Sequence, residues 1–391
     1  AYAPEDSIYL SFEYQPGGNG NSPESDDKLV LEFYSPTRDK WDVVWESEGK
    51  TFDKFKEECN CDFKRVYIPL TDTSYLKKGF RFRFYNYVSL TNNLMPSWAS
   101  TNDNWNIDYV YLAEGRHNGD SIDDAAILGA DKILKGYTSV PLRHFDVDLL
   151  SDSLRFSYKI NGNSSITVGR QFIIRDISKK ENIIEVLQTP VTSLTSEAGM
   201  TEEYDEPNTY NFLSNIAVDS ATFEVVSIIN STDKIESNNK YIDNVRLWNY
   251  YSYDDGSAER GWGLTNVKNG KFAYKFDIRK QDTLRGISIF FNNVKDEANV
   301  KYFYLCVWKS LFPEQLVYKK NWQLPKSGES IGGFSYYMFN DTDFVIDNSY
   351  GGVIYIGIIQ KSEESLNIGF DMNNDAMSKL YVNVNNIWEN S

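Results

Sequence analysis

Alternation of apolar and polar residues with a period of two is the dominant pattern along this chain. The segment Phe80-Arg81-Phe82-Arg83-Phe84 places its aromatic side chains on one face of an extended strand and its charges on the other. Alternation of this kind, or a short apolar run between turn residues, predicts strands over 7–14, 28–34, 41–45, 63–70, 80–88, 105–112, 149–160, 165–175, 222–230, 240–251, 271–278, 283–291, 302–308, 350–360 and 366–371. A short helical turn is expected over 51–58. The sequence therefore predicts an all-β fold.

Turn-rich segments divide these strands into three groups. We expect a first domain over 1–114, a linker of glycine, asparagine and acidic residues over 115–134, a second domain over 135–251 and a third over 252–391. A chain of 391 residues is long enough for each domain to bury its own core. The interpretation is a series of tandem β-sandwich domains, of which the second is immunoglobulin-like and the third jelly-roll-like.

Two local patterns refine this picture. Asn161-Gly162-Asn163 suits a turn that requires positive φ, so the strands on either side of it are expected to form a hairpin. The segment 197–208 is acidic and rich in turn residues, and is expected to be an exposed loop.

Composition narrows the classes of partner. Aromatic residues make up 15% of the chain, which favours sheets and contact surfaces, because aromatic rings pack well on pleated surfaces. The formal net charge of -16 would repel phosphate backbones, so nucleic acid is excluded as a partner. Apolar runs are too short to cross a bilayer, so we expect no direct membrane span.

The sequence contains few residues that could form a catalytic site. His117 and His144 are the only histidines, which leaves few arrangements of the Ser-His-Asp or Cys-His kind. Paired carboxylates need no histidine, but the acidic run 202–206 does not fit the spacing of a jelly-roll glycosidase, and Pro207 argues against a central strand. We expect a protein that is not an enzyme, with an acidic glycosidase as the distant alternative.

Calcium is the one cofactor that the sequence favours. Asp26 and Asp27 follow a loop rich in glycine and proline, and such turns supply the hard oxygen ligands of Ca²⁺. Asp108 lies inside a strand pattern, where a carboxylate needs a hydrogen-bond donor, a sheet edge or a cation. The pair Asp254-Asp255 before Gly256 is better explained as a turn in which aspartate accepts backbone N–H groups.

Cysteine gives little further information. Cys59 and Cys61 form a C-x-C pair with no other metal ligand nearby, and alternation places Cys306 among buried strand residues. The odd count argues against a disulfide scaffold.

Exposed aromatic side chains are the candidates for contact with a partner. Trp98 lies in the loop 91–104, where the sequence pattern does not assign it to a hydrophobic core. Tyr204 lies in the acidic segment 197–208. We assign both as candidate partner-binding residues. The further tryptophans that could stack on a sugar ring are Trp41, Trp45, Trp105, Trp262 and Trp388, of which Trp105 is better explained as a core residue. The sequence does not distinguish an aromatic residue that stacks on a glycan from one that contacts a protein.

Five segments together resemble a family of Bacteroidota envelope proteins, in which a MAM-like jelly roll precedes further β-sandwich modules. They are 7–16 (SIYLSFEYQP), 105–110 (WNIDYV), 253–259 (YDDGSAE), 282–286 (DTLRG) and 366–371 (LNIGFD). Family members have further strands before the first of these segments. We therefore expect the first domain to be a MAM-like jelly roll that lacks its opening strands, and the chain to be part of a longer protein.

The resemblance also implies a function. Members of this family accompany the type 9 secretion system, whose outer-membrane translocon is a very large barrel with a soluble plug at its periplasmic mouth. We therefore expect a soluble plug or accessory subunit, located in the periplasm and bound to the outer-membrane barrel protein. The alternative is a carbohydrate-binding adhesin on the cell surface.

Overall fold

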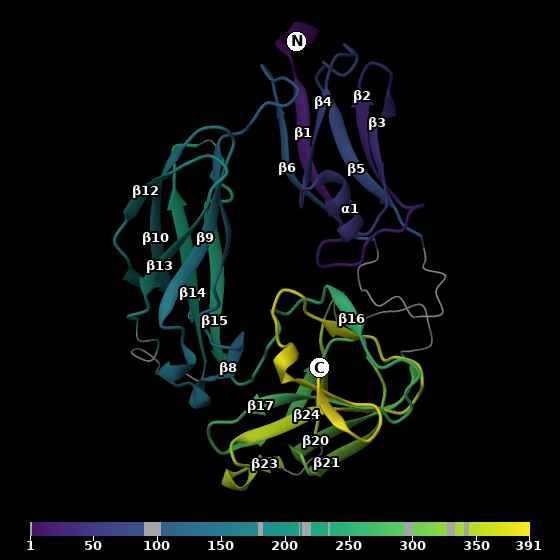
Figure 1. Cartoon of the computed structure of the whole chain (residues 1–391), viewed down its shortest axis with the longest axis vertical. Helices are drawn as coiled ribbons and strands as arrows, with labels where there is room; N and C mark the ends of the chain where they lie inside the picture. Colours follow the sequence, from purple (N-terminus) through teal and green to yellow (C-terminus); the bar gives the residue numbers. More distant parts are fainter. Residues whose placement is uncertain are drawn as a thin grey trace.

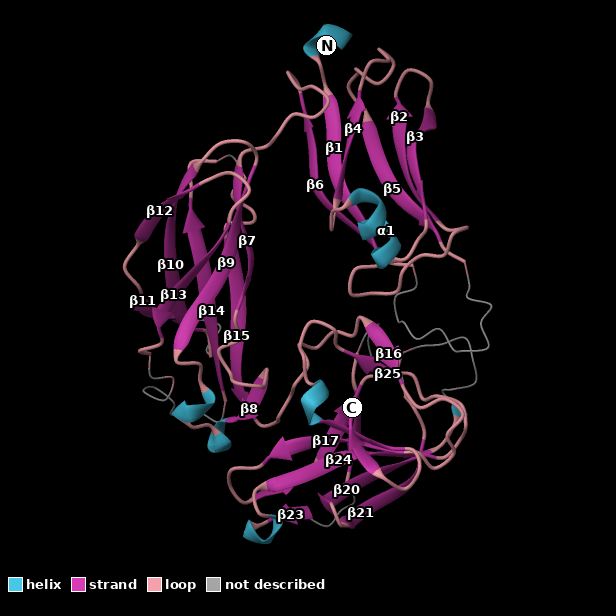
Figure 2. Ribbon diagram, viewed as in Figure 1, coloured by secondary structure: helices cyan, strands magenta, loops and turns pink. Residues whose placement is uncertain are grey.

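The computed structural model consists of three β-sandwiches that follow one another along the chain (Figure 1). It describes residues 2–89, 103–178, 183–210, 212, 220–233, 235–292, 300–326, 333–339 and 344–391. Strands dominate, and the single α-helix among these residues packs at one end of the first sandwich (Figure 2). The prediction of an all-β fold built from tandem sandwiches is confirmed.

The first sandwich has two antiparallel sheets of three strands, with the orders β4-β1-β6 and β3-β2-β5. Its elements are β1 (Tyr9–Pro16), β2 (Lys28–Ser35), β3 (Lys40–Glu48), α1 (Phe52–Cys59), β4 (Lys64–Pro69), β5 (Arg81–Tyr87) and β6 (Trp105–Ala113). Alternation along β1 turns Leu10 and Phe12 inward, where both side chains are fully buried. The Phe12 ring meets the edges of Trp45 and Phe84 at centroid distances of 5.0 and 4.9 Å. Burial of such a ring stabilises the fold by about 2 kcal/mol.

Helix α1 confirms the short helical turn expected over 51–58. Thr51 caps the helix, because its hydroxyl accepts the backbone N–H of Lys54. Phe55 points from the helix into the core of the first sandwich. Cys59 at the end of α1 forms a disulfide with Cys61, and this pairing differs from the interpretation of the C-x-C pair drawn from the sequence.

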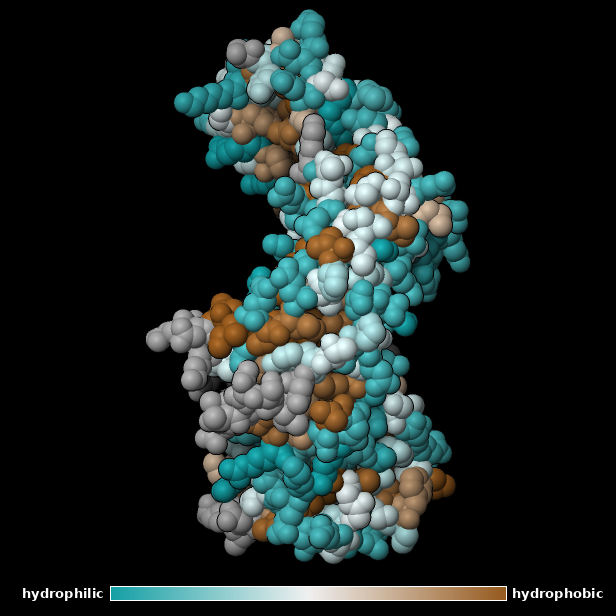
Figure 3. Space-filling model, turned by 90° about the vertical axis from the view of Figure 1, so that its left-hand side faces the viewer, coloured by the Kyte–Doolittle hydropathy of each residue, from teal (hydrophilic) through white to brown (hydrophobic). Residues whose placement is uncertain are grey.

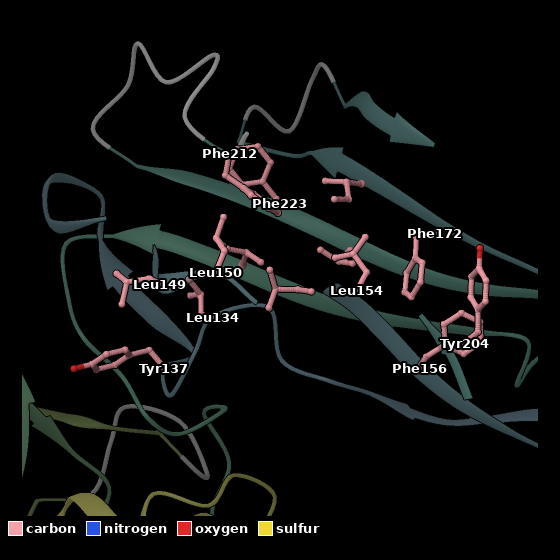
Figure 4. Close-up of a cluster of buried hydrophobic side chains, with 14 of the residues drawn as sticks. Leu134, Tyr137, Leu149, Leu150, Leu154, Phe156, Phe172, Tyr204, Phe212 and Phe223 are labelled. Atoms are coloured by element: carbon pink, nitrogen blue, oxygen red, sulfur yellow. The ribbon is translucent and has the colours of Figure 1, made fainter. Parts of the chain in front are cut away.

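The second sandwich packs the sheet β11-β10-β14-β15-β8 against the sheet β13-β9-β7, and β12 pairs with β10 beside the first of these. Its strands are β7 (Asp124–Ala130), β8 (Ser139–Pro141), β9 (Ser153–Asn161), β10 (Ile166–Asp176), β11 (Ile184–Gln188), β12 (Thr192–Ser196), β13 (Thr201–Pro207), β14 (Ala221–Asn230) and β15 (Lys240–Trp248). Side chains from both sheets meet in one core (Figure 4).

Three expectations from the sequence differ from this arrangement. The range 115–134 was expected to be a linker, but it contains strand β7 of the second sandwich. Gly162 has the positive φ of 89° that the turn requires, yet the hairpin is wrong, because β9 and β10 lie in opposite sheets. The exposed loop over 197–208 is also wrong, because Thr201–Pro207 forms β13, which pairs with β9.

The third sandwich is built on a six-stranded sheet of order β21-β20-β24-β17-β26-β27, covered by three two-stranded ladders. Its strands are β16 (Arg260–Trp262), β17 (Lys271–Asp277), β18 (Asp282–Leu284), β19 (Gly286–Ile289), β20 (Phe303–Leu311), β21 (Glu314–Gln323), β22 (Ser335–Met338), β23 (Phe344–Ile346), β24 (Val353–Gln360), β25 (Ile368–Phe370), β26 (Leu380–Asn383) and β27 (Trp388–Asn390). Short 3₁₀ turns complete the chain at η1 (Pro4–Asp6), η2 (Leu142–His144), η3 (Val147–Leu149), η5 (Asn348–Tyr350) and η6 (Met377–Lys379).

A buried polar network joins the first sandwich to the second. Tyr109 of β6 donates its hydroxyl hydrogen to Asp124 at the start of β7. The Tyr109 oxygen also accepts an N–H from Asn161 at 2.8 Å, and Asn238 donates to Asp124 at 2.9 Å. Because Asp124 is fully buried, these donors offset the cost of removing its carboxylate from water.

Aromatic rings join the second sandwich to the third. Tyr137, in the segment before β8, stacks on Tyr253, and Tyr253 stacks in turn on Phe276 of β17. The Tyr253 hydroxyl donates to the carbonyl of Lys275, and the backbone N–H of Asp277 donates to the Tyr137 hydroxyl at 3.2 Å. The rings therefore supply apolar contact while their polar ends stay hydrogen-bonded.

The third sandwich also contacts the first. The guanidinium group of Arg260 donates to the backbone carbonyls of Asn19 and Gly20, at 3.0 and 3.4 Å. Asn19 and Asn373 are hydrogen-bonded through their side chains at 3.1 Å. Each pair of sandwiches thus shares hydrogen bonds, and the loop between β1 and β2 carries the contact with the third.

Candidate metal centre

Three carboxylates converge at one end of the first sandwich. Glu24 lies in the loop between β1 and β2, Asp27 directly precedes β2, and Asp103 lies two residues before β6. Each offers an oxygen atom, and these atoms all lie within 4.8 Å of one another. Because β2 and β6 belong to opposite sheets, the cluster connects the two layers of the sandwich.

Asp27 is held in place by backbone groups. One of its carboxylate oxygens accepts the N–H of Glu24 at 2.8 Å, and the other accepts the N–H of Ser89 at 2.6 Å. Its side chain is only 1% exposed. Such aspartate-to-backbone hydrogen bonds explain why a sequence rich in turn residues folds into a tight loop here.

Asp103 has no comparable support. It is also 1% exposed, and neither of its carboxylate oxygens has a hydrogen-bond donor among the described residues. The Oε2 atom of Glu24 is buried without a donor as well. Burial is the main cause, and together with the close negative charges of Asp27, Glu24 and Asp26 it raises the pKa of Asp103 to about 8.

The negative charge of a buried carboxylate like Asp103 can be neutralised in two ways. It can hold a proton, or it can be neutralised by a cation, because an isolated buried charge is very costly. Carboxylate oxygens without sulfur or imidazole ligands suit a hard cation such as Ca²⁺. The orphaned oxygens of Asp103 and Glu24 therefore fit a calcium ion that Glu24, Asp27 and Asp103 would hold, and the ion would supply positive charge that cross-links the two sheets.

Only one of the aspartates that the sequence suggested as calcium ligands belongs to the cluster. Asp27 belongs to the cluster, and Asp26 is exposed beside it, where its charge contributes to the raised pKa of Asp103. Asp108 lies apart from the cluster: it is exposed on β6, and its carboxylate accepts the backbone N–H of Tyr109 at 2.7 Å. Asp254 accepts the N–H of Gly256 at 3.1 Å, as expected for a turn.

The sequence did not reveal Glu24 or Asp103 as candidate ligands. Asp103 follows a segment that was interpreted as a loop for partner contact, and Glu24 was overlooked beside the more obvious pair Asp26 and Asp27. Their positions along the chain could have indicated the site. All three cluster residues lie just before predicted strands of one domain, at a single end of the sandwich.

The candidate partner-binding residues have different outcomes. Tyr204 cannot serve in this way, because alternation along β13 turns its ring into the core of the second sandwich (Figure 4). It is 6% exposed, stacks on Phe172 at 5.5 Å, and donates its hydroxyl hydrogen to Glu206 at 2.7 Å. Trp98 lies outside the described residues.

Comparisons with known proteins assign no family to the chain. No family model matches it, and no curated protein matches it. Among solved structures, one similar chain is Bacteroides uniformis β-glucuronidase 2 covalently bound to cyclophellitol-6-carboxylate aziridine, with a TM-score of 0.24 and 8% identity over 67% of this chain. Another is a Bacteroides uniformis β-glucuronidase, with a TM-score of 0.25 and 8% identity over 69% of this chain. The chain spans 27% and 28% of these two chains.

One further observation concerns membranes. Among the described residues, no helix has both the length and the apolar character needed to cross a bilayer.

Proposed function

We propose that this chain is a non-enzymatic, exported β-sandwich protein that binds another envelope protein, as a soluble plug or accessory subunit of the type 9 secretion translocon. The proposed location is the periplasm, at the large outer-membrane barrel. The partner and the location come from the resemblance of five short segments, among them 105–110 and 253–259, to envelope proteins of that system.

One structural observation supports a binding role above the others. Each of the three sandwiches shares hydrogen bonds with both of the others, through Tyr109 and Asp124, through Tyr137 and Asp277, and through Arg260 and Asn19. Sandwiches linked in this way present loops and sheet faces of more than one domain to the same large partner. An extended interface of that kind suits a barrel much wider than any single sandwich.

The surface is compatible with contact at several places. On the face that lies to the left in Figure 1, apolar side chains occur in separate patches among polar ones (Figure 3). Exposed apolar residues of the second sandwich include Leu128, Ile183, Ile184, Val191 and Leu194. An apolar patch with a polar rim is a surface on which a folded, soluble partner can dock.

Calcium has a structural role in this proposal. The cluster of Glu24, Asp27 and Asp103 would bind one ion and fix the loop between β1 and β2, which also contacts the third sandwich. The ion would therefore help to hold the arrangement that the partner meets.

The test is purification of the native protein from its own membranes under mild detergent. Co-purification of a very large outer-membrane barrel supports the proposal, and recovery without any membrane protein contradicts it. The variant Arg260→Ala removes the two hydrogen bonds from its guanidinium group to Asn19 and Gly20, which weakens the contact between the third and first sandwiches, and it should lower recovery of the barrel. The matched control is Arg143→Ala, which changes an exposed arginine outside the three junction contacts.

A carbohydrate-binding surface adhesin is the second candidate. The third sandwich favours this candidate, because it exposes the aromatic rings of Tyr302 and Trp322 beside Lys319 and Lys361. None of these residues takes part in the contacts between sandwiches described above. Localisation on the cell surface and retention on polysaccharide, without any barrel, would select this candidate over the first.

A further inference from the structure

The third sandwich carries an exposed aromatic cluster on the outer side of its six-stranded sheet. Alternation along β20 directs Phe303 and Leu305 into the core, so Tyr304 between them faces outward. The ring of Trp322, on the neighbouring strand β21, meets Tyr304 edge-on at 5.3 Å. The ring centroids of Tyr302 and Trp322 lie 5.6 Å apart, with the two ring planes perpendicular. Trp322 is 63% exposed and Tyr302 is 46% exposed, so solvent reaches both rings.

Two lysines flank the same tyrosine. The Nζ atom of Lys361 lies 4.7 Å from the centre of the Tyr304 ring, and that of Lys319 lies 5.5 Å from it. Lys361 is hydrogen-bonded to the side-chain oxygen of Asn269. Within the described part of the chain, neither ammonium group has a carboxylate oxygen within 4.0 Å. Both ammonium groups are therefore available to an acidic ligand that reaches the Tyr304 ring.

The backbone at Trp322 has an unusual conformation. In the pairing of β20 with β21, Phe303 lies opposite Gln323 and Leu305 lies opposite Lys320, so two residues of β21 face Tyr304 alone. This is a β-bulge, and Trp322 adopts a left-handed φ of 58° within it. A bulky residue in that region is strained, and bulges redirect side chains. The strain is thus located where it exposes a large flat ring.

We propose that this cluster binds an acidic polysaccharide whose repeating unit is a uronic acid. The axial C–H bonds of a pyranose ring carry partial positive charge and pack against the electron-rich face of an indole, which Trp322 offers. The carboxylate of the sugar then lies between the ammonium groups of Lys319 and Lys361. A neutral sugar would use the ring but leave both cations unpaired. An acidic peptide would satisfy the cations but has no rigid ring to cover Trp322.

The overall negative charge does not prevent this contact. At physiological salt, charges are screened over about 8 Å, so the nearby lysines dominate the field that a bound sugar meets. The inference concerns the third sandwich alone, and it does not depend on the translocon proposal.

The test uses the whole purified protein at physiological salt, with polygalacturonate as the acidic polymer and dextran as the neutral one. Isothermal titration calorimetry should detect binding to polygalacturonate and at least tenfold weaker binding to dextran. The variant Trp322→Gly removes the ring and relieves the left-handed strain, so its melting temperature should not fall. Its affinity for polygalacturonate should fall at least tenfold, in line with the loss of one stacking contact.

Matched controls separate this site from general surface effects. Trp248→Ala removes another exposed tryptophan, 41% exposed on the second sandwich, and should leave the affinity unchanged. Lys319→Gln with Lys361→Gln should weaken binding at least tenfold, whereas Lys77→Gln with Lys78→Gln should not. Equal affinity for both polymers, unchanged binding by Trp322→Gly, or tighter binding to polyglutamate than to polygalacturonate would each overturn the proposal.

Discussion

Tyr253 stacks on Tyr137 with ring centroids 4.8 Å apart and planes inclined by 15°, and this pair forms the centre of the joint between the second and third sandwiches. Tyr253 continues the stack onto Phe276, 5.1 Å away. The joint is therefore made of ordered aromatic surface, as in the interior of a domain, and the two sandwiches should resist unfolding together.

Removing this ring should weaken the joint. Tyr253 is only 9% exposed, so Tyr253→Ala should lower the free energy of unfolding by about 3 kcal/mol, because it deletes a buried aromatic side chain. Calorimetry should show the second and third sandwiches melting over a wider range than in the parent protein. Tyr250→Ala, at a residue that is 39% exposed, should change stability by less than about 0.5 kcal/mol. Equal effects of the two substitutions would contradict the assignment.

Calcium should stabilise the protein through Asp103. An ion that binds only the folded state at 100 times its dissociation constant adds about 2.7 kcal/mol, which is readily visible as a higher melting temperature at pH 7. Asp103→Asn should abolish this increase, because it removes one ligand charge from the cluster. Asp108→Asn is the control, since Asp108 lies apart from the cluster and should keep the full response. A normal calcium response in Asp103→Asn would reject the site.

Stability without calcium should depend on pH between about 4 and 8. The pKa of Asp103 is raised to about 8 in the folded protein, whereas an unfolded aspartate titrates near 3.9. Between these values the folded state holds a proton that the unfolded state has lost, so stability is full below pH 4 and falls as the pH rises towards 8. The slope from this group is at most about 1.4 kcal/mol per pH unit. In urea titrations with chelator, Asp103→Asn should remove that slope, and saturating calcium should do the same in the parent protein.

Glu314 should act as a common acceptor for two tryptophans. Its carboxylate accepts the indole N–H of Trp308 at 3.0 Å and that of Trp388 at 3.2 Å, and it pairs with Lys271 at 2.8 Å. Glu314→Ala would leave buried donors without a partner, and should cost about 1–3 kcal/mol. The measurement is denaturation followed by tryptophan fluorescence. Gln315→Ala, at the next and exposed position, should have almost no effect.

Thiol counting should distinguish the three cysteines. Cys306 is fully buried, and burial raises the pKa of its thiol to about 12, so it should not react with maleimide in the folded protein. Denaturation without reductant should expose one reactive thiol, because Cys59 and Cys61 are bonded to each other. Denaturation with reductant should expose all three. Rapid labelling of the folded protein, or three thiols before reduction, would contradict these assignments.

The pattern of apolar and polar residues predicted the bounds of strands well where the strand is buried in the centre of its sheet. Strand β2 spans Lys28–Ser35 and β14 spans Ala221–Asn230, each within one residue of the expected range, because both are central strands with mainly apolar side chains. Strand β13 was missed for the opposite reason. It lies at the edge of its sheet, so several of its acidic side chains face solvent, and its composition is that of a loop.

Contacts between distant segments could not be deduced from local pattern. The turn chemistry at Gly162 was correct, but which strands pair depends on the packing of the whole sandwich. The candidate metal centre shows the same limit: Asp27 is recognisable beside its turn, whereas Asp103 joins it only because β2 and β6 face each other. Trp322 was also overlooked, since the bulge that exposes it arises from the register of two strands.

The loop between β1 and β2 belongs to two contacts at once. Its residues Asn19 and Gly20 receive hydrogen bonds from Arg260 of the third sandwich, and its residue Glu24 belongs to the carboxylate cluster. By thermodynamic linkage, an ion that favours one conformation of this loop changes the docking free energy of the third sandwich, and docking changes ion affinity by the same factor. A calcium ion bound by this cluster would therefore act as a clasp, because the local ion concentration would set how firmly the first and last sandwiches hold each other.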